Sequence, residues 1–190
     1  MYNTSMNNKL YVISGSSGVG KGTVIKGFLD KNPQFILSVS CTTRKPREGE
    51  TDGVNYFFLS KEEFQKNIDE DKFLEYAQFA GNFYGTKKKY VNERLAEGKN
   101  IILEIDTQGA LQVKKRMPEA ILIFICPPSF EELEKRLRGR HTEDEETIQR
   151  RLSKAKAELE RAENFDYKII NDSIDNAIKS IEKITVVQNA

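Results

Sequence analysis

The sequence GSSGVGKGT occupies positions 15–23, directly after the short apolar run at 10–14 and at the start of a helix expected over 21–30. Glycines in such a loop permit a positive φ and let the backbone amides turn inward around a phosphate group. The N-terminus of the helix adds partial positive charge, and the Lys21 ammonium can reach the outer phosphates of a nucleotide. A strand, a glycine-rich loop with a lysine and a helix in this order predict a nucleoside triphosphate site.

The loop departs from the pattern G-x-x-x-x-G-K-[ST] at one position. Gly22 stands where a serine or threonine is expected, and Thr23 follows one position later. The hydroxyl expected near Mg²⁺ is therefore displaced by one residue. A plain glycine-rich turn is the structural alternative, and four glycines beside a lysine argue against it. A dinucleotide fingerprint G-x-G-x-x-G is a poor match, because threonine stands where its last glycine belongs.

Strand and helix patterns alternate on the C-terminal side of this loop. Apolar runs at 101–105, 120–126 and 167–170 are typical of buried parallel strands, and a helical pattern follows each one. Repeated strand–helix units of this kind predict an α/β fold, a P-loop parallel sheet that carries helices on both faces.

Two regions interrupt this alternation, and the first is rich in strand patterns. It covers positions 37–84, with strands expected at 54–59 and 73–79. Between them, Ser60 and Glu63 form a capping box, in which a hydroxyl and a carboxylate satisfy the free amides of a helix start. This region predicts a small α+β insert.

The second interruption, at 129–163, is highly charged. Capping boxes at Ser129 with Glu132 and at Thr142 with Glu145 predict two helices. In the second helix a narrow apolar stripe recurs every three or four residues, at Ile148, Leu152, Ala155, Leu159 and Ala162. A mobile two-helix segment fits this pattern better than a core helix does.

The composition excludes several other functions. The 190 residues fit one domain and carry a formal charge of +1, whereas a nucleic-acid binder normally shows a basic excess. His141 is the one histidine of the sequence, and Cys41 and Cys126 lie far apart, so a Cys/His metal centre is excluded and a histidine-based nucleophilic triad is poorly supported. Positions 1–9 lack the apolar core of a signal peptide, and no apolar run approaches the ~20 residues of a membrane span, so a cytoplasmic location is expected.

A loop rich in arginine suggests a second phosphate site. Arg44 and Arg47 lie three positions apart in SCTTRKPREGE at 40–50, and guanidinium groups pair well with a phosphate monoester. A solvated surface turn would look the same in isolation. Tyr56, Glu75 and Tyr84 are polar positions within otherwise apolar runs, and spacing alone does not decide whether they bind a substrate.

The combination of these segments resembles guanylate kinase. The resemblance rests on the phosphate loop, on SCTTRKPREGE with GVNYFF at 53–58, and on FLEYA at 73–77 with GNFYGT at 81–86. The segments LEIDTQG at 103–109, RLRGR at 136–140 and IND at 170–172 follow in order, so the resemblance extends over positions 10–184. It implies an enzyme that joins ATP and GMP to give ADP and GDP with Mg²⁺ as cofactor, and dGMP is expected as a further acceptor.

The resemblance implies roles on the acceptor side. Glu75 would accept hydrogen bonds from guanine N1 and N2, and Ser40 would contact O6. Adenine lacks that pair of donors and would leave Glu75 desolvated and unpaired, which would discriminate between the bases. The implied GMP-binding residues are Ser40, Arg44, Arg47, Tyr56, Glu75, Tyr84, Gly85, Thr86 and Asp106, with both arginines and both tyrosines at the phosphate.

On the donor side, the resemblance implies that Lys21, Arg47, Arg140 and Arg151 act at the transferring phosphoryl group. Thr23 and Asp106 would meet Mg²⁺ through waters. A solvated helix face is the alternative reading of the arginines at 136, 140 and 151, because acids and bases are nearly balanced there. The implied ATP-binding residues are Gly15, Ser16, Ser17, Gly18, Val19, Gly20, Lys21, Gly22, Thr23, Arg136, Asn171 and Asp172.

Other proteins with a phosphate loop fit less well. A non-catalytic guanylate-kinase-like interaction module typically lacks the loop or its lysine, and both are present here. A switch GTPase would share the D-x-x-G element at 106–109, but no N-K-x-D motif occurs in the chain. The nearest alternative is another nucleoside monophosphate kinase, from which Glu75 and Ser40 distinguish this chain.

The expected organisation is therefore a single guanylate-kinase-like domain over 1–190. Its core would comprise about 9–37, 87–130 and 165–190, its GMP-binding insert about 38–86 and its helical lid about 131–164. The expected partners are the small molecules ATP and GMP, with no nucleic acid and no membrane. The chain is expected to be a monomer or a homodimer.

Overall fold

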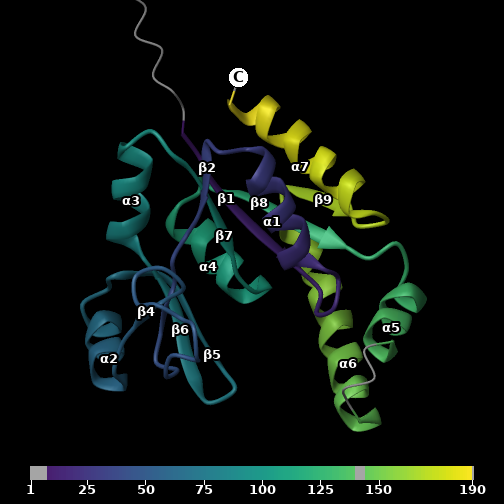
Figure 1. Cartoon of the computed structure of the whole chain (residues 1–190), viewed down its shortest axis with the longest axis horizontal. Coiled ribbons are helices and arrows are strands. Elements are labelled where there is room, and N and C mark those ends of the chain that lie inside the picture. The colour runs from purple at the N-terminus through teal and green to yellow at the C-terminus, as the bar shows by residue number, and fades with distance from the viewer. Residues whose placement is uncertain (1–7, 140–143, 190) are drawn as a thin grey trace, which may run out of the picture.

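The computed structural model describes residues 8–139 and 144–189, and a five-stranded sheet forms its centre (Figure 1). All paired neighbours in this sheet run parallel. In spatial order, the strands are β2 (Phe35–Leu37), β7 (Asn100–Glu104), β1 (Leu10–Gly15), β8 (Ile121–Cys126) and β9 (Tyr167–Ile170). The predicted parallel sheet is thereby confirmed.

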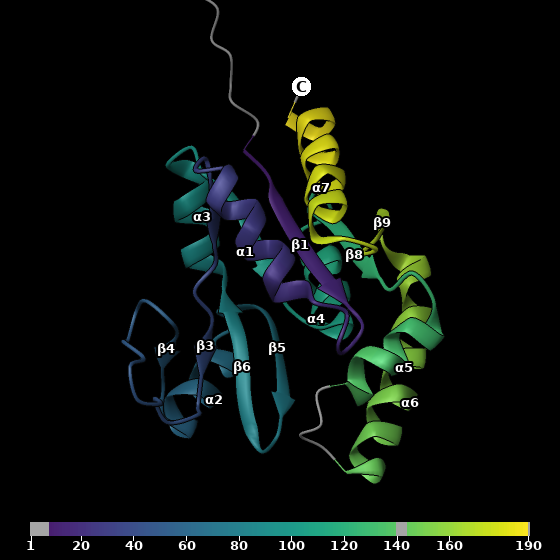
Figure 2. The ribbon, with the colours of Figure 1, turned by 45° about the vertical axis from the view of Figure 1, so that its right-hand side comes forward.

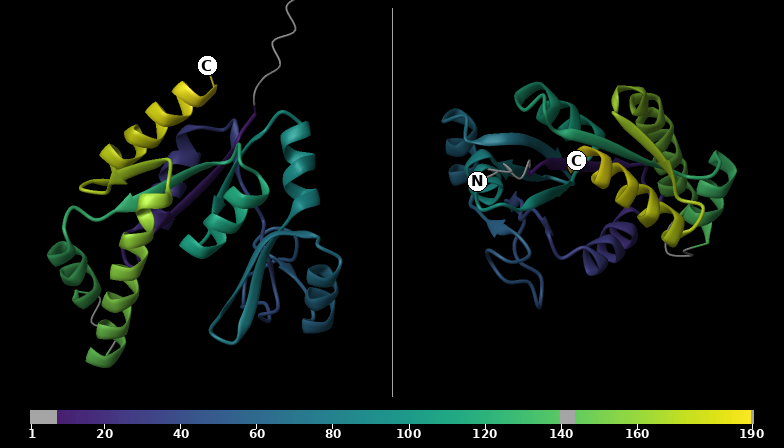
Figure 3. Two further views of the ribbon diagram at one scale, coloured as in Figure 1. Left: turned by 180° about the vertical axis from the view of Figure 1, so that it is seen from behind. Right: turned by 90° about the horizontal axis from the view of Figure 1, so that it is seen from above.

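Helices cover both faces of this sheet because successive strand residues point to opposite sides. Tyr11 and Ile13 of β1 belong to one buried cluster with residues of α1 (Lys21–Lys31) and α7 (Ile174–Asn189). Leu10 and Val12 belong to another cluster with residues of α3 (Lys88–Ala96) and α4 (Thr107–Arg116). Figure 3 shows the two helical layers from behind and from above. Helix α3 was missed from the sequence.

A second, mixed sheet contains the strands β4 (Phe57–Phe58), β3 (Cys41–Thr42), β6 (Asn82–Lys87) and β5 (Phe73–Phe79), in that spatial order. The helix α2 (Lys61–Asp69) packs on it through Phe64, whose ring stacks on Phe73 at 4.4 Å. Both hydrogen bonds of the Ser60 capping box are present, as predicted. The strand expected at 54–59 is wrong in extent, because only Phe57–Phe58 pair with β3. Strand β6 was missed.

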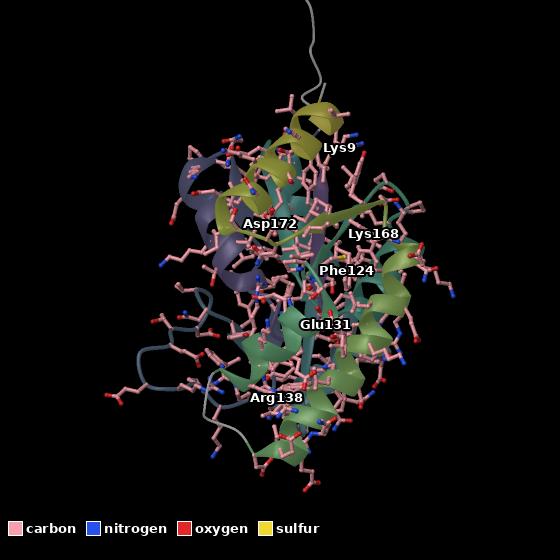
Figure 4. All side chains as sticks on the ribbon, turned by 90° about the vertical axis from the view of Figure 1, so that its right-hand side faces the viewer. Lys9, Phe124, Glu131, Arg138, Lys168 and Asp172 are labelled. Atoms are coloured by element: carbon pink, nitrogen blue, oxygen red, sulfur yellow. The ribbon has the colours of Figure 1, made fainter. Side chains whose placement is uncertain are left out.

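The charged region folds into two packed helices, α5 (Phe130–Arg138) and α6 (Glu145–Arg161), and a short 3₁₀ turn (Ala162–Asn164) follows α6. Leu133 and Leu137 of α5 form a buried cluster with Ile148, Leu152 and Ala155 of α6. At the far end of the pair, where Figure 4 labels it, the Arg138 guanidinium binds Glu134 and, through two nitrogens, Glu145. An ion pair with two parallel hydrogen bonds fixes geometry well.

Two details of the predicted α6 are corrected. Ser129 caps α5 as expected, but α6 begins at Glu145 with Asp144 as its cap, and Thr142 lies outside the described residues. The stripe also differs at its C-terminal end, where Glu158 is buried and Leu159 is only half-buried.

The second sheet and the α5/α6 pair extend from the same end of the central sheet, on either side of the loop between β1 and α1 (Figures 1 and 2). Strand β1 begins and α7 ends at the opposite end of the molecule. Among the described residues, no helix combines the length and apolarity that crossing a membrane requires.

Candidate functional site

The loop between β1 and α1 adopts the shape expected of a phosphate loop. Gly18 and Gly20 have φ values of 86° and 89°, in the left-handed region that favours glycine. Gly20 is the N-cap of α1 and offers no side chain, so the first amides of the helix face the loop. The Val19 N–H donates to the Ser16 carbonyl at 3.1 Å and closes a turn within the loop.

A cavity of about 410 Å³ lies beside this loop. The Asn171 amide donates to the Val19 carbonyl at 2.7 Å, and both terminal nitrogens of Arg136 donate to the Asn171 carbonyl at 3.2 Å. Asn171 therefore connects the loop, β9 and α5. The lining residues are Gly18, Val19, Gly20, Thr23, Arg136, Asn171, Asp172, Ser173 and Ile174, which include seven of the predicted ATP-binding residues.

A second cavity, of about 270 Å³, lies between the mixed sheet, the end of β7 and helix α6. Its lining carries three carboxylates and one ammonium group, which makes it a polar site for a ligand with hydrogen-bond donors. The lining residues are Ser40, Tyr56, Glu75, Ala77, Phe79, Tyr84, Gly85, Glu104, Ile105, Asp106 and Lys154, which include six of the predicted GMP-binding residues.

Glu75 is a carboxylate in this second cavity with only 4% of its surface exposed. The Thr86 hydroxyl donates to Glu75 Oε1 at 2.6 Å. Burial raises the pKa of Glu75 to about 7, and the charge of Asp106 adds to this, while the Thr86 bond acts against it. Thr86 is itself buried and lines neither cavity. Its expected role in GMP binding is therefore indirect, because it holds the Glu75 carboxylate in place.

Gly109 makes room for the Glu75 carboxylate. A Cβ atom at position 109 would lie 2.8 Å from Glu75 Oε2 and 3.3 Å from Ile105 Cδ1. The glycine of the D-x-x-G element at 106–109 therefore has a local packing role next to the second cavity. Asp106 in the same element caps α4 by accepting from the Gly109 N–H at 2.8 Å.

The arginine loop is ordered by Glu50. Arg44 Nη2 lies 2.8 Å from Glu50 Oε1, and the Arg47 backbone N–H donates to Glu50 Oε2 at 2.8 Å. Both hydrogen bonds lower the pKa of Glu50, and the bond from Arg44 has the larger effect. The Arg44 guanidinium also lies 5.4 Å from the centre of the Tyr56 ring, which packs against Tyr84 at 6.1 Å. Arg44 thus borders the second cavity through two of its lining tyrosines.

Lys21 follows the phosphate loop and lies close to Glu104, a lining residue of the second cavity. Its Nζ is 3.9 Å from Oε1 of Glu104, and a Cβ atom at Gly22 would lie 3.7 Å from the same oxygen. Glu104 therefore brings a carboxylate next to the position from which the loop hydroxyl is missing. Mg²⁺ in nucleotide sites takes one or two carboxylates, waters and phosphate oxygens, and this oxygen donor set fits it. The described residues include no cluster of three metal-ligating side chains.

The structure brings some predicted residues together and leaves others apart. Thr23 lines the first cavity and Asp106 the second, so they do not share one cavity as a metal pair. Arg47 is exposed on its loop, Arg151 is half-buried on α6, and neither is among the described residues that line the two cavities. Arg140 lies outside the described residues.

Sequence reasoning missed the residues through which helix α6 reaches the site. Lys154 lines the second cavity, and its Nζ lies 5.2 Å from the centre of the Phe79 ring at the tip of the β5–β6 hairpin. A lysine on a charged helix looks like a solvated residue, so no signal identified it. Glu104 lies inside the segment LEIDTQG, and nothing in the sequence identifies it as a neighbour of Lys21.

Comparisons with known proteins agree with this geometry. A family model described as guanylate kinase matches residues 7–188. Guanylate kinase of a Prochlorococcus marinus strain is 54% identical over 177 residues, which is 93% of this chain and 96% of that protein. Guanylate kinase of Synechocystis sp. is 50% identical over 181 residues, or 95% of each chain. The crystal structure of guanylate kinase from Anaplasma phagocytophilum superposes with a TM-score of 0.76 at 31% identity, covering 97% of this chain and 88% of that one.

Proposed function

The chain belongs to the guanylate kinase family, and from this premise we propose which of its residues carry out the reaction. The protein is an ATP:GMP phosphotransferase of purine nucleotide metabolism. One observation carries the assignment of its acceptor site: the buried Glu75, held by Thr86, presents a carboxylate inside a cavity next to Lys21 and Glu104.

ATP occupies the cavity beside the phosphate loop. Backbone amides of the phosphate loop and of the first turn of α1, together with the Lys21 ammonium, hold the triphosphate, because the loop glycines and the α1 N-terminus present donors and partial positive charge there. Asn171, Asp172 and Arg136 contact the adenosine side, where they line the same cavity.

GMP occupies the second cavity. Glu75 accepts hydrogen bonds from guanine N1 and N2, Ser40 contacts O6, and Gly85 and Asp106 complete the wall. Arg44, Tyr56 and Tyr84 bind the GMP phosphate, and Arg47 joins them from its exposed loop when the site fills. The same contacts leave room for dGMP as a further acceptor.

The transfer needs no general base, because the acceptor phosphate is already anionic at neutral pH. Lys21, Arg47, Arg140 and Arg151 neutralise the charge that spreads over the transferring group, which is the main catalytic requirement of phosphoryl transfer. Mg²⁺ supplies further neutralisation when it is bound with ATP. Glu104 and Asp106, which both line the second cavity, would hold it through waters. The protein acts in the cytoplasm as a monomer or homodimer.

The test of the acceptor site is a panel of nucleoside monophosphates. ADP formation from ATP is measured with GMP, dGMP, AMP and UMP for the unaltered chain and for Glu75→Gln and Arg44→Ala. We expect activity with GMP, little with AMP, and a selective loss of GMP use in both variants. Equal use of AMP, or unchanged GMP kinetics in both variants, would contradict the assignment.

A further inference from the structure

Glu158 is a buried carboxylate for which the phosphoryl transfer described above has no role. Only 4% of its surface is exposed, although it lies on the charged helix α6. Its Oε2 accepts a hydrogen bond from the backbone N–H of Ser17 in the phosphate loop, at 3.0 Å and 141 positions away in the sequence. A carboxylate is costly to bury without partners, so this contact needs a physical explanation.

The charge of Glu158 makes its place beside the phosphate loop unexpected, because a carboxylate repels the triphosphate that the loop binds. Lys154, one turn earlier on α6, offsets that charge with its Nζ 3.8 Å from Glu158 Oε1. What remains is a charge-assisted hydrogen bond that fixes one amide of the loop. The contribution of Glu158 is therefore geometric.

A second contact between the loop and the two-helix region lies at the next residue. A Cβ atom at Gly18 would lie 2.6 Å from Leu137 Cδ2, so the α5 side chain packs directly on the loop backbone. Leu137 belongs to the same buried cluster as Leu152 and Ala155 of α6. The loop is thus held at neighbouring residues by both helices.

We propose that Glu158 is a positioning residue that sets the place of Arg151 on α6 relative to the phosphate loop; this inference rests on the proposed function. Arg151 lies seven residues before Glu158, which is just under two turns and about 10 Å along the helix, on the same side. Because a helix is stiff over this length, anchoring Glu158 to the Ser17 amide fixes the distance from which Arg151 reaches a phosphate held by the loop.

The test compares four variants of the full chain. Glu158→Gln keeps an oxygen acceptor at the same reach, Glu158→Asp keeps the charge one methylene short, and Glu158→Leu removes the acceptor. Glu160→Leu is the matched control, because Glu160 is exposed on the same helix. Thermal melting establishes that each variant is folded, calorimetry measures GMP binding without ATP, and steady-state assays give kcat and the KM for ATP. Amide hydrogen exchange reports on the Ser17 N–H.

We expect kcat to fall about tenfold or more in Glu158→Leu and Glu158→Asp, with faster exchange of the Ser17 amide, as loss of a hydrogen bond to a charged group implies. Glu158→Gln and Glu160→Leu should keep kcat within about threefold, and all four should bind GMP as the unaltered chain does. A Gln variant as impaired as the Leu variant would overturn the proposal, as would an unimpaired Asp variant. If Glu158→Leu does not fold, the difference in kcat between Glu158→Asp and Glu158→Gln tests the proposal. Absence of GDP formation by the unaltered chain would instead contradict the proposed function.

Discussion

Burial changes the acid–base behaviour of a single side chain at Glu75. Desolvation raises its pKa to about 7, so near neutral pH the free protein holds Glu75 partly protonated. Guanine N1 and N2 are hydrogen-bond donors, and donors favour the ionised carboxylate. Binding of GMP is therefore coupled to loss of a proton from Glu75.

This coupling predicts proton release on GMP binding at pH 7. Calorimetry in two buffers of different ionisation enthalpy measures the number of protons released. The unaltered chain should release more than Glu75→Gln, which should also bind GMP about tenfold or more weakly. The GMP phosphate titrates near pH 6 in both proteins, so the difference between them belongs to Glu75. Equal proton release would show that Glu75 is already ionised in the free protein.

The same pKa predicts a pH dependence of stability. The folded-state pKa of Glu75 lies above its ordinary value of 4.5, so the folded state holds more protons between pH 4.5 and 7. Its contribution to stability is present below pH 4.5 and is lost as the pH rises through 7. Glu75→Gln should therefore raise the free energy of unfolding at pH 8, by roughly 3 kcal/mol, and leave it unchanged at pH 4. Urea denaturation at both pH values measures this, and a difference independent of pH would contradict it.

The close approach of Gly109 to Glu75 predicts that a larger residue at position 109 weakens GMP binding. In Gly109→Ala the new methyl group would lie 2.8 Å from Glu75 Oε2 and push the carboxylate away from its place. The KM for GMP should rise about tenfold, and the KM for ATP should stay within about twofold. Gln108→Ala, on the exposed neighbouring residue, is the control. An unchanged KM for GMP would show that Glu75 reaches the base from another rotamer.

Among the elements, α4 helps to place the acceptor site because it holds strand β5. The Gln112 side-chain amide pairs with Tyr76 of β5 in the manner of a neighbouring strand, accepting from its N–H at 3.2 Å and donating to its carbonyl at 3.0 Å. Arg116 donates to the carbonyls of Phe73 and Leu74. The strand that carries Glu75 is thereby attached to a helix of the central sheet.

Removing the Gln112 amide should loosen this attachment. In Gln112→Leu, the Tyr76 N–H should exchange faster with solvent, and the KM for GMP should rise about three- to tenfold, as expected from the loss of two neutral hydrogen bonds. Lys115→Leu, on the exposed side of the same helix, should change neither quantity. If the Tyr76 amide exchanged as slowly in Gln112→Leu as in the unaltered chain, the prediction would be wrong, and other contacts would hold β5 in place.

Elements with a clear apolar period were predictable from sequence, and those that depend on tertiary contacts were not. The strands at 10–15, 121–126 and 167–170 are short, mainly apolar runs that are each followed by a helix, so their place in a parallel sheet followed from pattern. Strand β6, with the sequence NFYGTK, has no such period and forms because β5 and β3 pair with it. Glu158 could not be predicted as buried, because its carboxylate bonds to the Ser17 amide, which is 141 positions away in the sequence.

In the whole molecule, the mixed sheet and the α5/α6 pair meet where Lys154 approaches Phe79. The local motifs of the nucleotide sites could be recognised in the sequence. This contact could not, because it joins residues that lie 75 positions apart and belong to no sequence motif. The division into core, insert and lid, and the motion expected of the last two, stay predictions.

The position of Lys154 beside Phe79 leads to a prediction about the charge of the second cavity. Lys154 is the one ammonium group among its described lining residues, opposite the carboxylates of Glu75, Glu104 and Asp106. Lys154→Ala should raise the KM for the dianion GMP about three- to tenfold, an effect that added salt reduces. Lys156→Ala, exposed on the same helix, is the control. Steady-state kinetics at two ionic strengths measure both, and equal behaviour of the two variants would remove Lys154 from the site.

The start of β1 and the end of α7 lie together at the end of the molecule opposite the loop between β1 and α1. A fluorescent label, a fusion partner or an immobilisation tag attached at the start of β1 or the end of α7 would therefore lie away from the phosphate loop. Such attachments leave the second sheet and the α5/α6 pair unobstructed, so the protein can be tethered to a surface or linked to another enzyme with its substrate entrances open.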